Sequence, residues 1–302
     1  MKKIIVTTTI NPPTQALLKY SLLKDWKLIV VGDLKTPHKD FIKLKNIIYL
    51  DPRSQDKISK KLSSVIGWNC IQRRNIGFFL AYKMGADIIA SVDDDNIPLK
   101  NWGKNLLVNK HVNVRIFSEK NRFFDPLSVT EHKKIWHRGF PVQLLHKRDP
   151  NFIGKQKIFC LVQADLWNGD PDIDAICRIA NNPEIKFKKF LPYSTNQLTP
   201  FNSQNTFISG KFIKYFPMLP FVGRMDDIWG AYYMQFKLNK KKPFIVYNNA
   251  SVYQKRNKHN LINDLKNEII GYDYTMKLNK KNFIGILPKD TKKFLKIWKT
   301  LF

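Results

Sequence analysis

The sequence predicts an α/β protein whose first hundred residues form a Rossmann-like nucleotide-binding half. Short apolar runs alternate there with segments of helical periodicity, which is the pattern of a parallel sheet covered by helices on both faces. One apolar run, residues 87–92, ends in the acidic sequence Asp93-Asp94-Asp95-Asn96. The carboxyl ends of strands are where open α/β sheets bind their ligands.

The elements of this first half are expected in a regular order. Apolar runs predict strands at residues 3–8, 26–31, 46–50 and 87–92. Apolar side chains at helical spacing predict three helices. The first begins after its cap, Thr14, the second covers residues 55–66, and the third covers residues 73–84 and is ended by Gly85. The absence of a GxGxxG fingerprint argues against a dinucleotide cofactor.

The second half is less regular and richer in Pro, Asn and aromatic residues. Strands are expected at residues 157–162, 205–209 and 244–247, and helices at 227–238, 261–276 and 288–301. No linker or internal repeat is visible. We therefore expect one domain, residues 1–302, in which a nucleotide-binding half of about 1–100 continues into a second half of about 101–302. The boundary between the halves is expected within 100–150.

The chain is strongly basic, with 52 Lys and Arg against 24 Asp and Glu and a net charge of +28. Such a surface attracts polyanions: nucleic acid, anionic lipid headgroups or a phosphorylated substrate. The lysines are mostly dispersed, which is also typical of a solvated surface. No RNA- or DNA-reading motif is present, so we expect no nucleic-acid partner, and a basic nucleic-acid-binding protein is kept as the alternative from another class.

Cysteine content and hydropathy bear on the compartment. The chain has three cysteines and no CxxC spacing, which disfavours disulfides and zinc and indicates a reducing compartment. No signal-peptide layout is present, and no apolar run approaches the ~20 residues that cross a bilayer. We expect a cytoplasmic protein and leave open peripheral contact with an anionic membrane.

The acids after residue 92 are the first candidate site. Carboxylates in one small volume raise one another's pKa unless a cation lies among them. Mg²⁺ and Mn²⁺ accept carboxylate oxygens and keep positions open for substrate phosphates. An acidic turn facing water is the alternative.

A second candidate is Arg73-Arg74-Asn75, at the start of the predicted helix that precedes the acidic strand. Helix amino termini attract anions, and arginine forks match phosphate oxygens. The alternative is a surface pair of arginines. His259 is a candidate nitrogen ligand for a metal, although a lone histidine is more often structural.

The remaining candidates lie in the second half. Asp226 and Asp227 open an aromatic helix that includes Trp229, so an acid there could act as a general base, or simply cap the helix. Residues 165–174 are expected to form a loop suited to sugar hydroxyls, or a turn before an acid-capped helix. The candidate sugar-binding side chains of this loop are Trp167, Asn168 and Asp170.

Several segments resemble a known family. Residues 6–14, 31–37, 73–78 and 93–96 resemble the catalytic domain of STELLO-type glycosyltransferases. Residues 138–141, 166–175 and 223–229 resemble those proteins and also the reversibly glycosylated polypeptides, which are UDP-arabinopyranose mutases. The similar segments run in order from about residue 5 to about residue 273.

The resemblance implies a GT-A fold in which a nucleotide-sugar-binding half joins an acceptor half. It implies a DxD metal site at Asp93 and Asp95, where Mn²⁺ or Mg²⁺ would bridge the diphosphate of a nucleotide sugar, which we expect to be a UDP-sugar. The side chains expected around the nucleotide are Thr7, Thr8, Thr9, Asp33, Arg73, Asn75, Asp94 and Asn96.

The resemblance also implies an activity. Arg74 matches an arginine that is important in the mutases, and Asp227 matches the acid that serves as base in inverting GT-A enzymes. We therefore expect a metal-dependent transferase acting on a hydroxyl of a glycan or lipid-linked acceptor, with a UDP-sugar mutase as the alternative. The mutases have a histidine near the position of Gln254, so His259 is the substitute third metal ligand.

Overall fold

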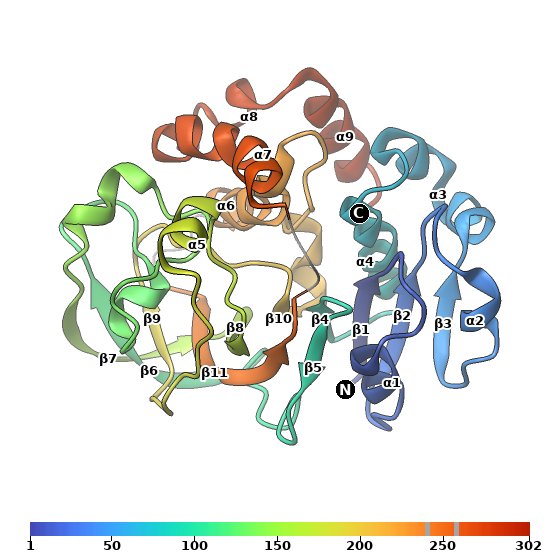
Figure 1. Cartoon of the computed structure of the whole chain (residues 1–302), viewed down its shortest axis with the longest axis horizontal. Coiled ribbons are helices and arrows are strands. Elements are labelled where there is room, and N and C mark those ends of the chain that lie inside the picture. Colours follow the sequence, from blue (N-terminus) through green and yellow to red (C-terminus); the bar gives the residue numbers. More distant parts are fainter. Residues whose placement is uncertain (239–241, 257–259) are drawn as a thin grey trace.

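The structure is a computed structural model that describes residues 1–238, 242–256 and 260–302. Strands from both halves of the chain join in one mixed sheet, in the order β3-β2-β1-β4-β10-β8-β11-β9-β6-β7, and β5 pairs with β11 at one side (Figure 1). The predicted α/β class with a mixed sheet is confirmed.

The first half follows the predicted order of elements. The parallel strands β3, β2, β1 and β4 lie side by side in the sheet. The bounds are β1 Lys3–Thr8, α1 Gln15–Ser21, β2 Lys27–Val31, α2 His38–Ile42, β3 Ile47–Leu50, α3 Pro52–Ile66, α4 Arg74–Lys83 and β4 Ile88–Val92.

Both faces of these strands are buried, which is why their sequences are continuous apolar runs rather than alternating ones. In β1, Ile4 and Val6 face the core that contains α4, while Ile5 faces the core that contains α1. The Thr14 hydroxyl accepts a hydrogen bond from the backbone N–H of Leu17 and caps α1, as expected.

The second half contributes mostly antiparallel pairs, with parallel pairs at β8–β11 and β6–β9. Its bounds are β5 Asn96–Pro98, β6 His111–Ser118, β7 Asn151–Phe159, β8 Val162–Gly169, α5 Ala175–Asn181, β9 Tyr193–Thr195, β10 Asn205–Ser209, α6 Asp226–Leu238, β11 Ile245–Gln254, α7 Leu261–Tyr274, α8 Phe283–Ile286 and α9 Lys289–Lys299. Among the described residues, no helix is both long and apolar enough to span a bilayer.

One predicted strand and the first part of one predicted loop are wrong, whereas the predicted acid-capped helix after that loop is confirmed, with Asp174 capping α5. The chain turns at Cys160 and Leu161, so residues 157–162 belong to two strands, β7 and β8. Strand β8 then continues to Gly169, which places Trp167 in the sheet rather than in a loop. The acids and amides of β8 suggested a loop, but they are buried and paired: Gln163 donates to Asp165 and accepts from the N–H of Leu107.

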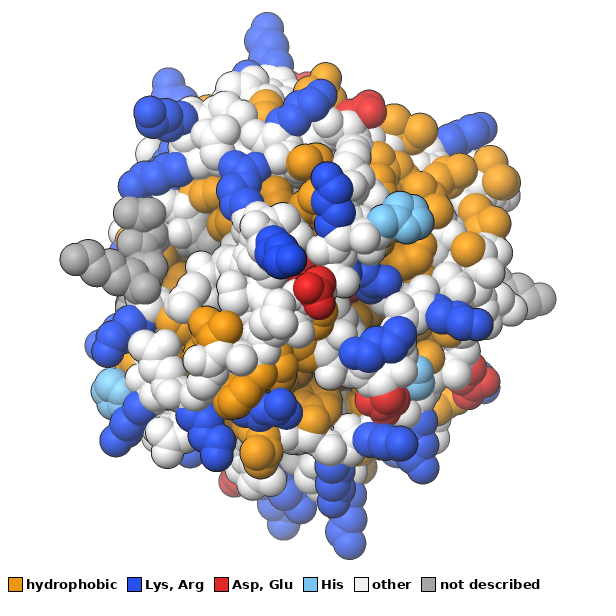
Figure 2. Space-filling view, turned by 90° about the vertical axis from the view of Figure 1, so that its left-hand side faces the viewer, with side chains coloured by type: hydrophobic (Ala, Val, Ile, Leu, Met, Phe, Trp, Pro, Cys, Tyr) orange, Lys and Arg blue, Asp and Glu red, His pale blue; other side chains and the backbone are white. Residues whose placement is uncertain are grey.

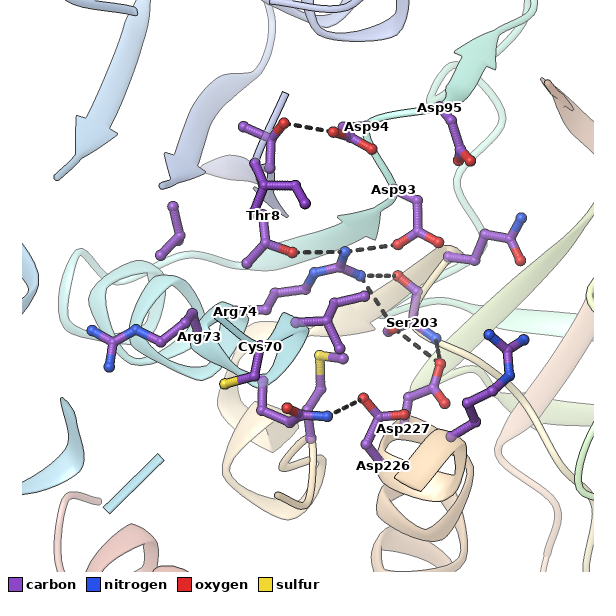
Figure 3. Close-up of a pocket in the computed structure, with 18 of the residues that line it drawn as sticks. Thr8, Cys70, Arg73, Arg74, Asp93, Asp94, Asp95, Ser203, Asp226 and Asp227 are labelled. Carbon is purple, nitrogen blue, oxygen red and sulfur yellow. Dashed lines mark hydrogen bonds and ion pairs between the residues drawn. The ribbon is translucent and has the colours of Figure 1, made fainter. Parts of the chain in front are cut away.

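The antiparallel strand β10 brings the two halves together at one end of the sheet. Asn205, the first residue of β10, pairs with Val92, the last residue of β4. The residues just before β10 therefore lie beside the acids just after β4. The start of α4 and the start of α6 reach the same place, which Figure 3 shows in close-up.

Candidate active site

A cavity of about 570 Å³ opens at this end of the sheet, a size usual for ligand pockets. Both halves of the chain line it. The first half contributes the chain after β1, β2 and β4 and the start of α4, and the second half contributes the chain before β10, the start of α6 and the end of β11. Its charged lining residues are Asp33, Arg73, Arg74, Asp93, Asp94, Asp95, Arg138, Asp172, Arg224, Asp226, Asp227 and Arg256.

Arg74 is the buried centre of the cavity wall (Figure 3). Its Nη2 donates to Asp93 Oδ1 at 2.7 Å and to the Thr8 hydroxyl at 3.2 Å. Its Nη1 donates to the Ser91 hydroxyl and to the carbonyl and hydroxyl oxygens of Ser203. Arg74 thus ties β1 and β4 to the chain before β10, and it holds the Asp93 carboxylate in place.

The three acids after β4 have different surroundings. The carboxylate of Asp94 turns toward the chain after β1, where it accepts hydrogen bonds from the Thr9 hydroxyl at 2.5 Å and the Asn11 amide at 3.0 Å. Burial raises the pKa of Asp94. Asp93 and Asp95 line the cavity on the other side of this turn (Figure 3). Asp94 therefore fixes the loop, and its two neighbours face the space where a ligand would lie.

The donor set of Asp93 and Asp95 fits a hard divalent cation. In the described part of the chain, no three acidic, histidine or cysteine side chains converge to form a metal site made of protein alone. Mg²⁺ is commonly bound by only one or two carboxylates, with waters and substrate phosphates completing its shell, so two carboxylates suffice. Seven aspartates against five arginines line the cavity in this part of the chain, so a phosphorylated ligand would also need added positive charge.

Asp226 and Asp227, the first two residues of α6, are both buried but differ in their partners. Asp226 accepts a hydrogen bond from the Gln72 amide at 2.8 Å. Burial, and then the charge of Asp227, raise the pKa of Asp226 to about 7. Burial acts in the same direction on Asp227, but Arg138 and the N–H of Ser203 outweigh it and lower the pKa of Asp227.

Arg138 and Asp172 are site residues that the sequence prediction missed. Arg138 donates to both carboxylate oxygens of Asp172, at 2.8 and 2.9 Å, and to both of Asp227, at 3.1 and 3.3 Å. Burial opposes the charge of this arginine, but the two carboxylates hold the pKa of Arg138 well above its usual value. Arg138 is a single arginine in its segment, and Asp172 is one of three aspartates in residues 170–174 with nothing to distinguish it, so only their presence in the family-like segments 138–141 and 166–175 could have indicated them.

Most of the other residues expected around the nucleotide serve the scaffold. The guanidinium of Arg73 turns away from Asp93 and Asp226 (Figure 3). It donates to Gln55 and Ser63 and stacks on Trp68 at 3.6 Å. Asn75 exchanges hydrogen bonds with the backbone of Met218. Two further residues, Thr7 and Asn96, are buried and outside the cavity lining, and Asn96 bonds Gln204.

Besides Asp94 and Arg73, three of the expected nucleotide-binding residues line the cavity. Thr8 and Thr9 follow the end of β1, and Asp33 follows β2. The two carboxylate oxygens of Asp33 accept from the backbone N–H groups of Leu34 and Cys70. Asp33 therefore joins the loop after β2 to the segment that leads into α4.

The structure does not bring the expected sugar-binding side chains into the cavity. The indole of Trp229 donates to the Thr275 hydroxyl inside the core, and Trp167 packs edge-on against His137. Asn168 accepts from the N–H of Phe187. An aromatic residue on a helix or strand packs in the core by default, and these follow that rule.

Of the two expected residues that remain, one lies in the described part of the chain. Asp170 is outside the cavity lining and forms ion pairs with Arg178 and Arg256. His259 lies outside the described residues, so its role as a metal ligand stays a prediction.

Comparisons with known proteins add two kinds of likeness. No protein-family model matches the chain. Among solved structures, glucosyl-3-phosphoglycerate synthase from Mycobacterium tuberculosis, in complex with Mn²⁺ and UDP-glucose, is similar over 91% of this chain and 78% of that one, with 11% identity and a TM-score of 0.46. The structure of A197 from STIV is similar over 83% of each chain, with 12% identity and a TM-score of 0.33.

Curated sequences give the second likeness. Probable glycosyltransferase STELLO2 of Arabidopsis thaliana is 23% identical over 235 residues, and STELLO1 is 24% identical over 229 residues. Each match covers 68% of this chain and 29% of the relative, so the chain matches less than a third of the length of these relatives. The resemblance expected from residues 6–14, 73–78 and 93–96 is confirmed, and the chain is related in sequence to the STELLO-type glycosyltransferases.

Proposed function

We propose that the chain is a GT-A glycosyltransferase that transfers a sugar from a nucleotide sugar, a UDP-sugar in the first instance, to an acceptor hydroxyl. One observation carries the proposal: Asp93 and Asp95 lie in the same cavity as Asp226, with Arg74 buried between the two halves. The relation to two probable glycosyltransferases supports it. The half of about 1–100 would bind the nucleotide sugar and the rest of the chain the acceptor.

The cation, Mn²⁺ or Mg²⁺, would be held by Asp93 and Asp95, and when bound it would offset the negative charge of the diphosphate. Arg74 would act through Asp93. Its hydrogen bonds to Asp93, Thr8 and Ser203 keep that carboxylate in one orientation, so we assign it a positioning role. Thr8, Thr9 and Asp33 would lie near the nucleoside because they follow the ends of β1 and β2.

We propose Asp226, rather than Asp227, as the proton acceptor. The carboxylate of Asp226 would remove the proton of the acceptor hydroxyl while the hydroxyl oxygen forms a bond to the anomeric carbon. The bond from that carbon to the diphosphate oxygen would break, and its electron pair would leave with the nucleotide. A pKa of about 7 suits a general base near neutral pH. Asp227 is occupied by Arg138 and Ser203, so it would position these groups instead.

The test is a thermal-shift scan of nucleotide sugars with and without Mn²⁺. A true donor stabilises the folded state by mass action, so it should raise the melting temperature only when the metal is present. Asp93→Ala and Asp95→Ala should remove that metal-dependent rise. No rise with any nucleotide sugar would contradict the proposal, and conversion of UDP-arabinopyranose to the furanose form without an acceptor would identify a mutase instead.

The setting of the enzyme is a further part of the proposal. The three cysteines are free, which fits a reducing, cytoplasmic compartment. The excess of basic residues fits peripheral contact with an anionic membrane, where a glycan or lipid-linked acceptor would be reached.

A further inference from the structure

Arg256, two residues after the end of β11, is a buried cation in the cavity wall. Its side chain is 8% exposed. Within the described part of the chain its Nε has no hydrogen-bond partner, and its Nη2 donates only to the Pro171 carbonyl, at 3.3 Å. A buried guanidinium in this condition is costly, because its lost hydration is only partly replaced: the Asp170 carboxylate lies 3.3 Å from Nε but accepts no hydrogen bond from it.

The carboxylates near Arg256 are already held by other arginines. Asp172 lies 3.8 Å from Arg256 but makes two hydrogen bonds of 2.8 and 2.9 Å with Arg138. Asp170 lies 3.3 Å from Arg256 but makes its shortest ion pair with Arg178. Arg256 is therefore the second arginine at each of these acids. Burial, and then the charge of Arg178, lower the pKa of Arg256, as expected for a cation with incomplete compensation.

The backbone places Arg256 next to the proposed metal site. Gln254 pairs with Asn96 across β11 and β5, and the N–H of Lys255 donates to the carbonyl of Asp95 at 3.3 Å. The guanidinium therefore belongs to the same end of the sheet as Asp93 and Asp95. An oxyanion close to those two acids and their cation would be within the part of the cavity that Arg256 also lines.

We propose that Arg256 is a phosphoryl-binding residue, whose guanidinium is completed by an oxyanion of the ligand. The phosphoryl group would come either from the diphosphate of the nucleotide sugar or from a phosphate carried by the acceptor. Arginine forks suit phosphate oxygens, and charge-assisted hydrogen bonds of this kind are the strong ones. The assignment of the two sources rests on the proposed function, whereas the anion site itself does not.

The test is calorimetric titration of wild type and Arg256→Gln with four probes. These are UDP with Mg²⁺, uridine with Mg²⁺, pyrophosphate with Mg²⁺, and inorganic phosphate added to protein saturated with UDP and Mg²⁺. If the donor supplies the phosphoryl group, R256Q should bind UDP and pyrophosphate about tenfold or more weakly and uridine as wild type does. If the acceptor supplies it, UDP binding should be unchanged and phosphate binding should fall by a similar factor.

Two variants make the result specific. Arg256→Lys keeps the buried charge but not the fork, so it guards against loss of folding and should lose affinity by a smaller factor than R256Q. Arg148→Gln is the matched control, because Arg148 is also a well-buried arginine but has Asp125 to itself at 2.8 Å, outside the cavity. It should bind every probe as wild type does.

The outcomes separate the two proposals. If wild type does not bind UDP but binds pyrophosphate, and R256Q binds pyrophosphate more weakly, the nucleotide-sugar function is contradicted and the anion site is supported. Equal binding of all probes by wild type and R256Q would overturn the role of Arg256, even if UDP binds well. Wild type that binds none of the anionic probes would overturn both.

Discussion

Asp226 and Asp227 are neighbours in sequence and in space, yet their surroundings shift their pKa values in opposite directions. Asp227 is surrounded by donors: Arg138, the backbone N–H and hydroxyl of Ser203, and the N–H of Ile228. Asp226 is buried beside that negative charge and receives one amide from Gln72. A pair of carboxylates so close cannot both ionise easily, and Asp227, which has an arginine and more hydrogen-bond donors, keeps its charge.

The pKa of Asp226 makes a prediction about stability. Because its folded-state pKa of about 7 exceeds the unfolded value, the protein loses stability as pH rises from about 4 through 7. Asp226→Asn removes that loss. We expect its unfolding free energy to exceed that of wild type at pH 8 by on the order of 4 kcal/mol, and to match it below pH 4, in urea titrations.

Asp227→Asn is the informative comparison for that experiment. Asp227 compensates the buried Arg138, so its neutralisation should destabilise the protein at pH 7 rather than stabilise it. If both variants shifted stability in the same direction at pH 8, the division of charge between the two aspartates would be wrong. If Asp226 is the base, the transferase rate of wild type should also rise with pH through about 7.

Arg74 and Asp93 form the second residue-scale prediction. Their 2.7 Å ion pair joins a fully buried guanidinium to a partly buried carboxylate. Arg74→Met leaves Asp93 without compensation and should cost about 3–5 kcal/mol of unfolding free energy. Asp93→Asn should cost less, because the asparagine oxygen can still accept a hydrogen bond from Arg74.

A double-mutant cycle measures whether the pair acts as a unit. The double variant R74M/D93N should be less destabilised than the sum of the two single variants, by about 1 kcal/mol or more. Additive effects in the cycle would mean that Arg74 does not position Asp93. Binding of Mg²⁺ and UDP should fall in all three variants, since each disturbs the orientation of the same carboxylate.

At the scale of elements, the conformation of one glycine controls where α6 begins. Gly223 has φ +58°, and a Cβ there would lie 2.0 Å from the Asn267 carbonyl of α7. Gly223→Ala is therefore strained and also clashes with backbone that cannot simply rotate away. We expect a loss of about 3 kcal/mol or more in urea unfolding, together with weaker binding of UDP and Mg²⁺, because Asp226 and Asp227 follow this turn directly.

Gly67 is the control for that prediction. It too has a positive φ, +81°, but no atom lies within 4 Å of its would-be Cβ. Gly67→Ala should cost only the backbone term of about 1–2 kcal/mol and leave ligand binding unchanged. Equal losses in the two variants would indicate that the contact between the turn at Gly223 and α7 has no part in placing the aspartates.

The first-half elements could be predicted from sequence because each carries a local signal. Residues 3–8 contain an apolar run of Ile4, Ile5 and Val6, and α3 has its cap, Asp51, immediately before it. The junction of β7 and β8 could not, because Ile158 to Val162 is one apolar run and the turn at Cys160 has no Gly, Pro or Asn to mark it. Only pairing with β10 and β11 decides where β8 starts.

The site divides in the same way. Asp93, Asp95 and Arg74 were predictable because each belongs to a short cluster of like residues at the end of an element. Arg138 and Arg256 were not, since each is a single arginine whose partners are distant in sequence: Asp172 and Asp227 for one, Asp170 and Asp172 for the other. Their partners are set by the tertiary structure, although Arg138 begins one of the family-like segments.

At the scale of the whole molecule, the excess of basic residues is visible on the surface. Figure 2 shows Lys and Arg side chains over much of one face, with few acids and with apolar patches between them. Strand β7, at the end of the sheet, exposes Phe152, Ile153 and Phe159 together with two lysines. The guanidinium of Arg115, on β6, lies over the ring of Phe152 at 5.1 Å.

This combination on the antiparallel strand pair β6–β7 suits an anionic lipid surface. Lysines near such a surface each contribute about 1 kcal/mol of attraction, and exposed aromatic and aliphatic side chains can enter the headgroup region. The same lysines, Lys155 and Lys157, also discourage pairing of this edge strand with a second chain. Membrane contact is therefore expected at the β6–β7 strand pair more than at other basic parts of the molecule.

Sedimentation with vesicles tests that expectation. Wild type should co-sediment with vesicles that contain phosphatidylserine at low salt, and much less with neutral vesicles or in 0.5 M salt, since the attraction is screened. Lys155→Glu/Lys157→Glu should weaken binding about tenfold or more. The control, Lys57→Glu/Lys60→Glu, makes the same charge change at exposed positions of α3, at the other end of the sheet. Equal losses in the two double variants would mean that the whole basic surface, and not the β6–β7 strand pair, produces the attraction. A wild-type protein that binds neither kind of vesicle would exclude a membrane role for this charge.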